Sequence, residues 1–270
     1  MKYFIVDAFA DSLFKGNQAG VCLLDEWLDT ATMQKIAFEN NLAETAFVVK
    51  REKHYDLKWF TPEIEIDLCG HATLASAFIV FSFIDTAADV IEFNTLSGIL
   101  KVSRSEDMYE MDFPARSPKK IELTPQMSES VGVPVLEAYI SRDLLMLVED
   151  EEKVLDLVPD YEIMKALPDS LGKIVTARGT NADFVSRFFM PGSSIPEDPV
   201  TGSAHSTLIP FWAERLGKDE MIAKQLSERG GTLYCKNEGD RVKIAGKAVL
   251  YLQGEILIPV DQGRGRSQVL

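Results

Sequence analysis

The sequence has few of the residues that most metal centres and disulfide frameworks require. Only three of its 270 residues are cysteines and only three are histidines. Cys22, Cys69 and Cys235 are an odd number with no metal-like spacing, which predicts neither a disulfide framework nor a zinc site. A glycine-rich phosphate loop and a dinucleotide fingerprint are also missing. We therefore expect a protein that works without a bound metal or other cofactor.

The sequence also lacks an excess of basic residues and a long hydrophobic run. Lys and Arg number 28 against 42 Asp and Glu, which gives a formal net charge of −14. Nucleic acids and anionic membranes bind to basic surfaces, so the composition favours a small-molecule substrate over either partner. The longest apolar run, residues 72–84, is shorter than the roughly 20 residues that span a bilayer. We expect a cytoplasmic protein and leave its oligomeric state, a homodimer included, open.

What the sequence does contain is an internal repeat. Residues 98–115 (GILKVSRSEDMYEMDFPA) and 231–248 (GTLYCKNEGDRVKIAGKA) each predict two strands joined by a turn, with the alternating apolar positions of a sheet that has one buried face. Upstream of each hairpin, residues 59–81 and 188–212 share the order aromatic residue, proline, acidic residues, glycine and helix. The matching segments occur in the same order, and each lies nearly the same number of residues from its partner, which indicates a duplicated unit.

A third match supports the duplication. The segment AETAFVV (residues 43–49) aligns with TNADFVS (residues 180–186), which pairs Glu44 with Asn181. Each half of the chain then has the order strand, helix, strand, glycine-containing turn, apolar helix and hairpin.

The helix predicted after Gly70 is apolar on every side. A helix without a polar face has to be surrounded by other parts of the protein. We therefore expect an α+β fold with two pseudo-symmetric lobes, residues 1–116 and 117–270, each a curled and mostly antiparallel sheet around a central apolar helix. The alternative is a helix between the layers of an ordinary α/β fold. Whether the tail after about residue 255 returns to the first lobe is left open.

Residues 197–205 (EDPVTGSAH) come directly before the second predicted helix. Helix starts favour such residues because their first N–H groups lack partners, so Thr201 or Ser203 could serve as an ordinary cap. If the turns at Gly70 and Gly202 face each other across a cleft between the lobes, however, two helix dipoles point at one small volume. Such a volume suits a carboxylate or a developing oxyanion.

Four segments resemble the PhzF-like isomerases of phenazine biosynthesis. They are GNQAGV (residues 16–21), NLAETAFV (41–48), FTPEIEIDLCGHAT (60–73) and EDPVTGSAH (197–205). The resemblance covers nearly the full chain. It implies the diaminopimelate epimerase fold, in which each of two lobes curls a sheet around a central helix, and it implies an isomerase.

The resemblance also implies roles for particular residues. Glu44 matches the glutamate that shuttles a proton between carbon atoms, and its helpers match His71, Asp198 and Ser203. The substrate-binding residues that it implies are Asn17, Gly70 and Gly202. An ordinary turn residue is the alternative for Asn17, because asparagine is common in turns.

The residues themselves add further expectations. Glu44 lies in an otherwise apolar stretch, which suits a general base, although a solvated residue at a strand end fits the sequence as well. The helix dipole predicts a lowered pKa and a neutral imidazole for His71. Cys69 is either an inert buried thiol or a reactive one. His205 should face its own lobe, because it lies two positions beyond Ser203 and such neighbours do not share a helix face.

The function that we expect is a cofactor-independent isomerase or epimerase, which moves a proton on a small carboxylate-bearing metabolite with Glu44 as the shuttle. Two alternatives stay open. One is a non-catalytic protein that binds a small ligand or a partner in the same cleft, and the other is a racemase that uses Cys69 together with Glu44. A racemase with two thiols is not predicted, because Val200 and Thr201 precede Gly202 where a second cysteine would be needed.

Overall fold

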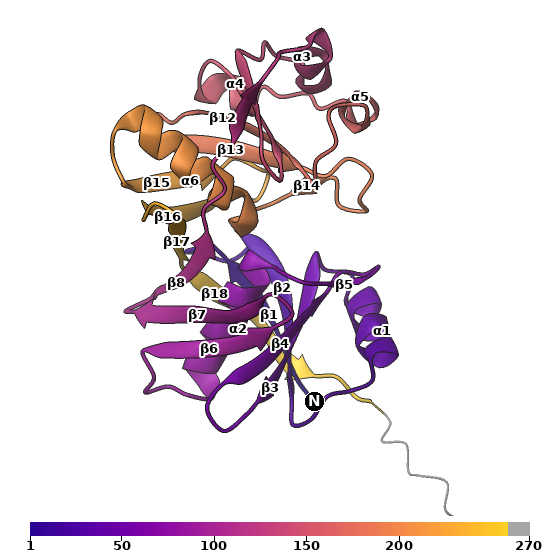
Figure 1. Ribbon diagram of the computed structural model, residues 1–270. Helices are drawn as coiled ribbons and strands as arrows, with labels where there is room; N and C mark the ends of the chain where they lie inside the picture. Colours follow the sequence, from indigo (N-terminus) through magenta and orange to yellow (C-terminus); the bar gives the residue numbers. More distant parts are fainter. Residues whose placement is uncertain (259–270) are drawn as a thin grey trace, which may run out of the picture.

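The computed structural model describes residues 1–258, in which six helices and eighteen strands form two stacked lobes (Figure 1). The elements of the first lobe are β1 (Lys2–Ala8), β2 (Asn17–Leu24), α1 (Thr30–Asn40), β3 (Glu44–Lys50), β4 (Tyr55–Phe60), β5 (Glu65–Ile66), α2 (Gly70–Phe83), β6 (Val90–Thr95), β7 (Gly98–Ser105) and β8 (Met108–Pro114).

The second lobe repeats much of this order. Its elements are β9 (Lys119–Ile121), α3 (Pro125–Val131), β10 (Glu137–Ile140), β11 (Leu144–Leu147), α4 (Glu151–Leu155), α5 (Tyr161–Lys165), β12 (Lys173–Arg178), β13 (Phe184–Phe189), β14 (Glu197–Asp198), α6 (Gly202–Leu216), β15 (Glu220–Gln225), β16 (Gly231–Asn237) and β17 (Arg241–Gly246). The last strand is β18 (Ala248–Glu255).

The duplication is present, and two of the three sequence matches are confirmed. The hairpins β7–β8 and β16–β17 occupy equivalent places, and the segments β5–α2 and β14–α6 precede them. The match of residues 43–49 with 180–186 is wrong. β3 pairs in parallel with β2 and antiparallel with β4, and the strand with the equivalent pairings is β12, whereas residues 180–183 lie in the turn between β12 and β13. Glu44 therefore has no counterpart at Asn181.

Most strand pairs are antiparallel, as expected. The exceptions are the parallel pairs β2–β3, β4–β6, β11–β12 and β13–β15. The two lobes also share strand pairing, because β8 of the first lobe pairs with β17 of the second. The eighteen strands therefore form one continuous hydrogen-bonded sheet that curls twice, rather than two separate sheets.

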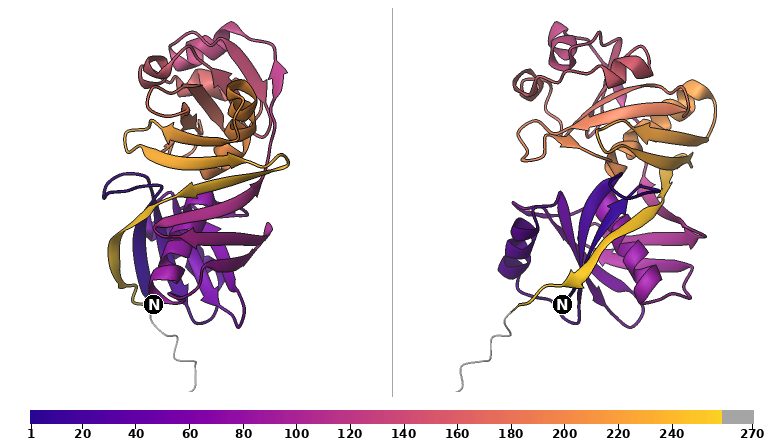
Figure 2. Two further views of the ribbon diagram at one scale, coloured as in Figure 1. Left: turned by 90° about the vertical axis from the view of Figure 1, so that its left-hand side faces the viewer. Right: turned by 180° about the vertical axis from the view of Figure 1, so that it is seen from behind.

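Each lobe receives one strand that follows the hairpin of the other lobe. β9 comes after β8 and pairs with β10 in the second lobe, and β18 comes after β17 and pairs along the whole of β1. Figure 2 shows β18 running from the second lobe down the side of the first. The boundary near residue 116 stays a prediction, but β18 belongs to the sheet of the first lobe. The predicted tail beyond residue 258 lies outside the described residues.

The central helix α2 is enclosed by its sheet, which answers the question raised by its apolar composition. Nearly every residue from Gly70 to Phe81 is buried. Its two buried hydroxyl groups bond inside the helix, since Thr73 donates to the Cys69 carbonyl and Ser76 donates to the Ala72 carbonyl at 2.7 Å. Neither hydroxyl group therefore needs water, and a curled sheet rather than the layers of an α/β fold covers the helix.

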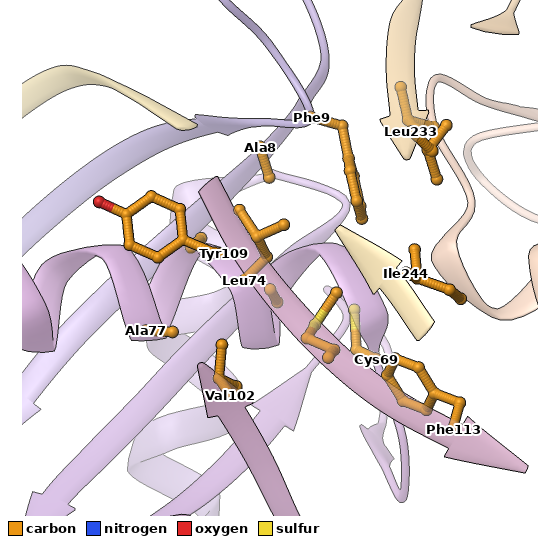
Figure 3. Packing of buried hydrophobic residues seen from close by; sticks show 14 of the residues in the cluster. Ala8, Phe9, Cys69, Leu74, Ala77, Val102, Tyr109, Phe113, Leu233 and Ile244 are labelled. Atoms are coloured by element: carbon orange, nitrogen blue, oxygen red, sulfur yellow. The ribbon is translucent and has the colours of Figure 1, made fainter. Parts of the chain in front are cut away.

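The hydrophobic core around α2 continues into the second lobe. Figure 3 shows Leu74 and Ala77 of α2 packed near Val102 of β7, with Leu233 and Ile244 of the second lobe in the same cluster. Burial of apolar side chains from both lobes in one core favours a fixed relative position of the lobes. The walls of a cleft between the lobes are therefore held in place by the core beneath them.

Residues 1–258 contain no helix that combines the length and the apolar character needed to cross a bilayer. The longest of these helices, α6, has 15 residues.

Candidate active site

The two central helices begin against each other. A Cβ atom at position 70 would lie 3.2 Å from the Cα atom of Gly202, and a Cβ atom at position 202 would lie 3.3 Å from the Cα atom of Gly70. Both positions need glycine because any side chain would push the helix starts apart. The N-cap residues, Cys69 and Thr201, make no side-chain capping hydrogen bond. The capping explanation for Thr201 is therefore wrong, and the first turns keep N–H groups that can bind an anion.

A cleft of about 540 Å³ opens beside these helix starts. Residues of both lobes line it, and among them are six of the seven predicted site residues: Glu44, Gly70, His71, Asp198, Gly202 and Ser203. The size is within the usual range for small-molecule sites. The structure thus brings together residues that are up to 159 positions apart in the chain, from Glu44 to Ser203.

Glu44 and His71 face each other in this cleft. Glu44 is the first residue of β3, and its side chain is only 15% exposed. Its Oε2 atom lies 3.0 Å from Nε2 of His71, within ion-pair distance. Both atoms are buried, yet neither has an aligned hydrogen-bond partner in residues 1–258. Buried polar atoms in proteins are nearly always hydrogen-bonded, and each of these two has no partner in residues 1–258 other than the opposite member of the pair.

The expectation of a lowered pKa for His71 is wrong. Burial acts to lower the pKa of this imidazole, but the neighbouring Cys69 sulfur and Glu44 carboxylate outweigh it, and the pKa lies well above its ordinary value. Burial also raises the pKa of the Cys69 thiol, which favours the uncharged form of that group. At neutral pH the carboxylate of Glu44 is therefore the main reason that His71 holds a proton. The helix dipole, which is visible in the sequence, is outweighed by an acid that comes from another strand, β3.

Asn17, predicted to bind substrate, does not line the cleft. It is buried at the start of β2, and its Nδ2 atom lies 3.1 Å from Nδ1 of His71, 2.7 Å from Oδ1 of Asp198 and 3.0 Å from the Val200 carbonyl oxygen. Its amide group thus joins a side chain of the first lobe to one of the second. This position suits a residue that orients His71 and Asp198 rather than one that touches a ligand.

Asp198 is held from several sides. Besides Asn17, the hydroxyl of Thr201 donates to Oδ2 of Asp198 at 2.5 Å. Gln225 supports this arrangement from β15, since its Nε2 atom donates to the Asp198 carbonyl at 2.6 Å and its Oε1 atom accepts from the Thr201 N–H at 2.8 Å. Burial raises the pKa of the Asp198 side chain from 3.8 to about 6, although His71 and the two hydrogen bonds oppose the shift.

This raised pKa predicts a pH dependence of stability. Consider a carboxyl group whose pKa is higher in the folded chain than in the unfolded chain. Its contribution to stability is complete at pH values below the unfolded-chain pKa and is lost as the pH rises through the folded-chain pKa. Here the window runs from pH 3.8 to about pH 6. In Asp198→Asn the loss should be absent.

We therefore expect the free energy of unfolding of Asp198→Asn, relative to the unsubstituted protein, to rise by about 1–3 kcal/mol between pH 4 and pH 7. Urea unfolding at several pH values measures this difference. The exposed Asp25→Asn is the matched control. A difference between Asp198→Asn and the unsubstituted protein that stays constant across the window would contradict the prediction.

Ser203, in the first turn of α6, is half-buried at the edge of the cleft. Its Oγ atom accepts a hydrogen bond of 2.8 Å from Nη2 of Arg142. Because this bond uses the hydroxyl oxygen as an acceptor, the hydroxyl hydrogen is free to point at a ligand. Arg142 and a second arginine, Arg116, also line the cleft.

Sequence reasoning missed Arg116, Arg142 and Gln225. Arg142 lies in a short polar turn between two apolar strands, which is a weak signal for a functional residue. No local pattern marks Arg116 or Gln225.

Cys69 and His205 are both buried. Cys69 lines the cleft, with its Sγ atom 3.6 Å from Nδ1 of His71. His205 faces its own lobe, as expected: its Nδ1 atom lies 2.9 Å from the Thr201 carbonyl oxygen and its ring packs near that of Phe184. Burial lowers the pKa of His205 to about 4, so this imidazole is neutral at neutral pH.

Glu44, Cys69 and His71 are also the kinds of side chain that bind metals, and their ligand atoms lie within 4.8 Å of one another. The sulfur lies 3.6 Å from Nδ1 of the imidazole, whereas the carboxylate lies 3.0 Å from Nε2, so the two groups contact different ring nitrogens. A zinc site needs ligands that converge on one point. We derive no metal-dependent step from these residues.

Known proteins resemble this chain over almost its whole length. The family model described as phenazine biosynthesis-like protein matches residues 6–254. An uncharacterised isomerase from Pseudomonas aeruginosa is 50% identical over 253 residues, which cover 94% of this chain and 97% of the relative. The human phenazine biosynthesis-like domain-containing protein is 38% identical over 287 residues, which cover 94% and 98% of the two chains. The chain belongs to the phenazine biosynthesis-like (PhzF) family of isomerases, as its motifs predict.

Solved structures agree with this assignment. A PhzF-family protein from Enterococcus faecalis has a TM-score of 0.93 at 49% identity and covers 95% of this chain and 99% of its own. A hydroxyproline epimerase from Agrobacterium vitis shares only 10% identity, with a TM-score of 0.63 over 94% of this chain and 91% of its own, and therefore shares the fold alone. The predicted diaminopimelate epimerase-like fold is confirmed.

Proposed function

We propose that this isomerase moves a proton on a small carboxylate-bearing metabolite without a cofactor, and that Glu44 carries the proton. The observation that supports this most strongly is the buried pair of Glu44 Oε2 and His71 Nε2, which lie 3.0 Å apart with no other hydrogen-bond partner in residues 1–258, in a cleft beside two helix starts. A general base must reach a C–H group without being fully occupied by protein hydrogen bonds.

The proposed reaction begins when Glu44 removes a proton from a carbon atom next to the substrate carboxylate. The electron pair of the broken C–H bond moves onto the carboxylate oxygens, and the resulting enolate is held by the N–H groups of the Gly70 and Gly202 turns and by the Ser203 hydroxyl. The proton then returns from Glu44 to the same carbon in an epimerisation. Where a C=C bond is conjugated with the carbanion, the proton returns instead to the far carbon of that allylic system and the double bond moves by one position, which is an isomerisation. No atom or electron is gained or lost, so no further reactant is needed.

The other site residues prepare this step. His71, whose pKa is raised, places a positive charge 3.0 Å from the carboxylate of Glu44. Asn17 lies 3.1 Å from Nδ1 of the imidazole and donates to Asp198 of the second lobe at 2.7 Å, so it keeps both side chains in place behind Glu44. The charges are in place before the substrate binds, so little reorganisation is required during the reaction.

Deuterium exchange tests the proposal. The protein is incubated in deuterated water with a panel of amino and hydroxy acids, and mass spectrometry and proton NMR follow the entry of deuterium at C–H positions. We expect exchange at the carbon next to the carboxylate of a bound acid. An acid that raises the melting temperature of the protein but shows no exchange would instead support a non-catalytic binding protein.

Cys69 allows the proposal to be distinguished from a racemase that uses this thiol with Glu44. The raised pKa of the buried Cys69 keeps it in the thiol form, which is a poor base. We expect Cys69→Ala to retain exchange within about threefold, whereas loss of a catalytic base costs about 10²–10⁴-fold. Cys22→Ala, which removes another buried free thiol, is the control. A large loss of exchange in Cys69→Ala alone would favour the racemase.

A further inference from the structure

The proposed reaction leaves two cations of the cleft unused. Arg116 follows β8 in the segment that leads to the second lobe, and Arg142 lies in the turn between β10 and β11. Both side chains line the same cleft as Glu44 and Ser203. Burial and the nearby charge of Arg142 lower the pKa of Arg116, which indicates that the two guanidinium groups are close enough to repel each other.

The charges around these arginines do not balance. Arg142 lies 3.3 Å from the buried carboxylate of Asp143, which also accepts the Gly172 N–H at 3.1 Å. Within residues 1–258 Arg116 has no carboxylate within 4.0 Å. Asp143 and the exposed Asp67 attract Arg116 only from a greater distance. The cleft lining also carries the carboxylates of Glu44, Glu63, Asp67 and Asp198, so the excess of positive charge is confined to the neighbourhood of Arg116. A cation held in a cavity without an ion-pair partner attracts an anionic ligand.

The two arginines are held in place relative to the helix start. The backbone N–H of Arg116 donates to the Ser206 carbonyl of α6 at 2.8 Å, and the side chain of Arg142 donates to Ser203 at 2.8 Å. The Arg142 guanidinium group is therefore held beside the first turn of α6. The backbone of Arg116 is tied to the same helix, which places its side chain in the cleft near Arg142.

The cleft has two sets of anion-binding groups. One is formed by the helix starts and the other by the arginines, of which Arg142 contacts Ser203 at the start of α6. The lining also includes the apolar side chains of Leu68, Leu171 and Phe188, which suit a carbon skeleton. A volume of about 540 Å³ is large for a single carboxylate with a short chain.

We infer that Arg116 and Arg142 determine specificity by binding a second carboxylate of the substrate, so that the substrate is a dicarboxylate. The inference rests on the proposed function, because that function identifies the end of the cleft at which the first carboxylate binds and the reaction occurs. Planar guanidinium groups bind carboxylates with two parallel hydrogen bonds, which gives both affinity and orientation. A monocarboxylate of the same length leaves the charge of Arg116 uncompensated.

Calorimetric titration with matched acids tests this inference. Dicarboxylates of four to seven carbons are compared with monocarboxylates of the same carbon number at neutral pH. We expect at least one dicarboxylate to bind about tenfold or more tightly than its monocarboxylate partner. Arg116→Gln should reduce this preference to about twofold and leave monocarboxylate binding nearly unchanged.

Lys119→Gln is the control, because it removes one positive charge from an exposed side chain outside the cleft. It should keep the preference of the unsubstituted protein. Circular dichroism and melting temperatures show whether Arg116→Gln is folded. Two results would overturn the inference: no preference for any dicarboxylate in the unsubstituted protein, or an equal loss of both kinds of acid in Arg116→Gln.

The titration does not require turnover, which separates this inference from the proposed function. Glu44→Gln should bind the preferred dicarboxylate while losing exchange. If the unsubstituted protein shows the preference but no deuterium exchange on that acid, the proposed function fails and the specificity site stands.

Discussion

Glu44→Gln should reduce deuterium exchange by about 10²–10⁴-fold, the usual contribution of a general base. Glutamine has nearly the same size and shape as glutamate, but its amide cannot accept a proton from carbon at neutral pH. The position is on a strand and is partly buried, so the substitution changes the chemistry more than the packing. Rates of deuterium uptake measured by mass spectrometry give the ratio directly.

A second measurement separates catalysis from structure. Glu44 raises the pKa of His71, so in Glu44→Gln the burial of the imidazole should dominate and the pKa of His71 should fall, which NMR titration of the ring signals detects. Glu63→Gln is the control, because Glu63 lines the same cleft but is exposed. If exchange survives in Glu44→Gln while the pKa of His71 falls as expected, Glu44 is not the proton shuttle.

Gly70→Ala should have the second largest effect, a loss of about 10²-fold in exchange. The added Cβ atom would stand 3.2 Å from the Cα atom of Gly202, so the starts of α2 and α6 must separate by a few tenths of an ångström. Oxyanion donors lose most of their effect when they move from the position where negative charge develops, and small misplacements of reacting groups are costly.

Gly254→Ala is the matched control, since its added Cβ atom would meet only the Leu252 side chain at 3.8 Å. Both variants should melt cooperatively and keep their circular dichroism spectra. In Gly70→Ala, a loss of exchange with a preserved fold supports the role of the paired helix starts. Full exchange in Gly70→Ala would show that the close approach of the two glycines serves packing alone.

The hairpins and the central helix could be predicted from sequence because their signals are local. The alternation of apolar residues in residues 98–115 and 231–248 depends only on the geometry of a strand with one buried face. The apolar run after Gly70 requires an enclosure, whatever the topology. The motifs around Glu44, His71, Asp198 and Ser203 were sufficient for the family, and the structure places these four side chains in one cleft.

The alignment of residues 43–49 with 180–186 was wrong for an equally physical reason. Short strands share alternating patterns, and such patterns do not specify which strand lies beside which. Strand pairing places β12 rather than residues 180–186 at the position equivalent to β3. Only hydrogen bonding between distant segments decides this correspondence.

By itself the sequence determined which elements form, that they repeat, and which side chains carry acid, base and hydroxyl groups, because propensity and apolar periodicity act over a few residues. The tertiary structure alone decided the charge state of His71, the position of Asn17 behind the cleft and the presence of Arg116 and Arg142 within it. Electrostatic and hydrogen-bond energies depend on distances of a few ångströms between groups far apart in the chain. Those distances exist only after the two lobes have packed together.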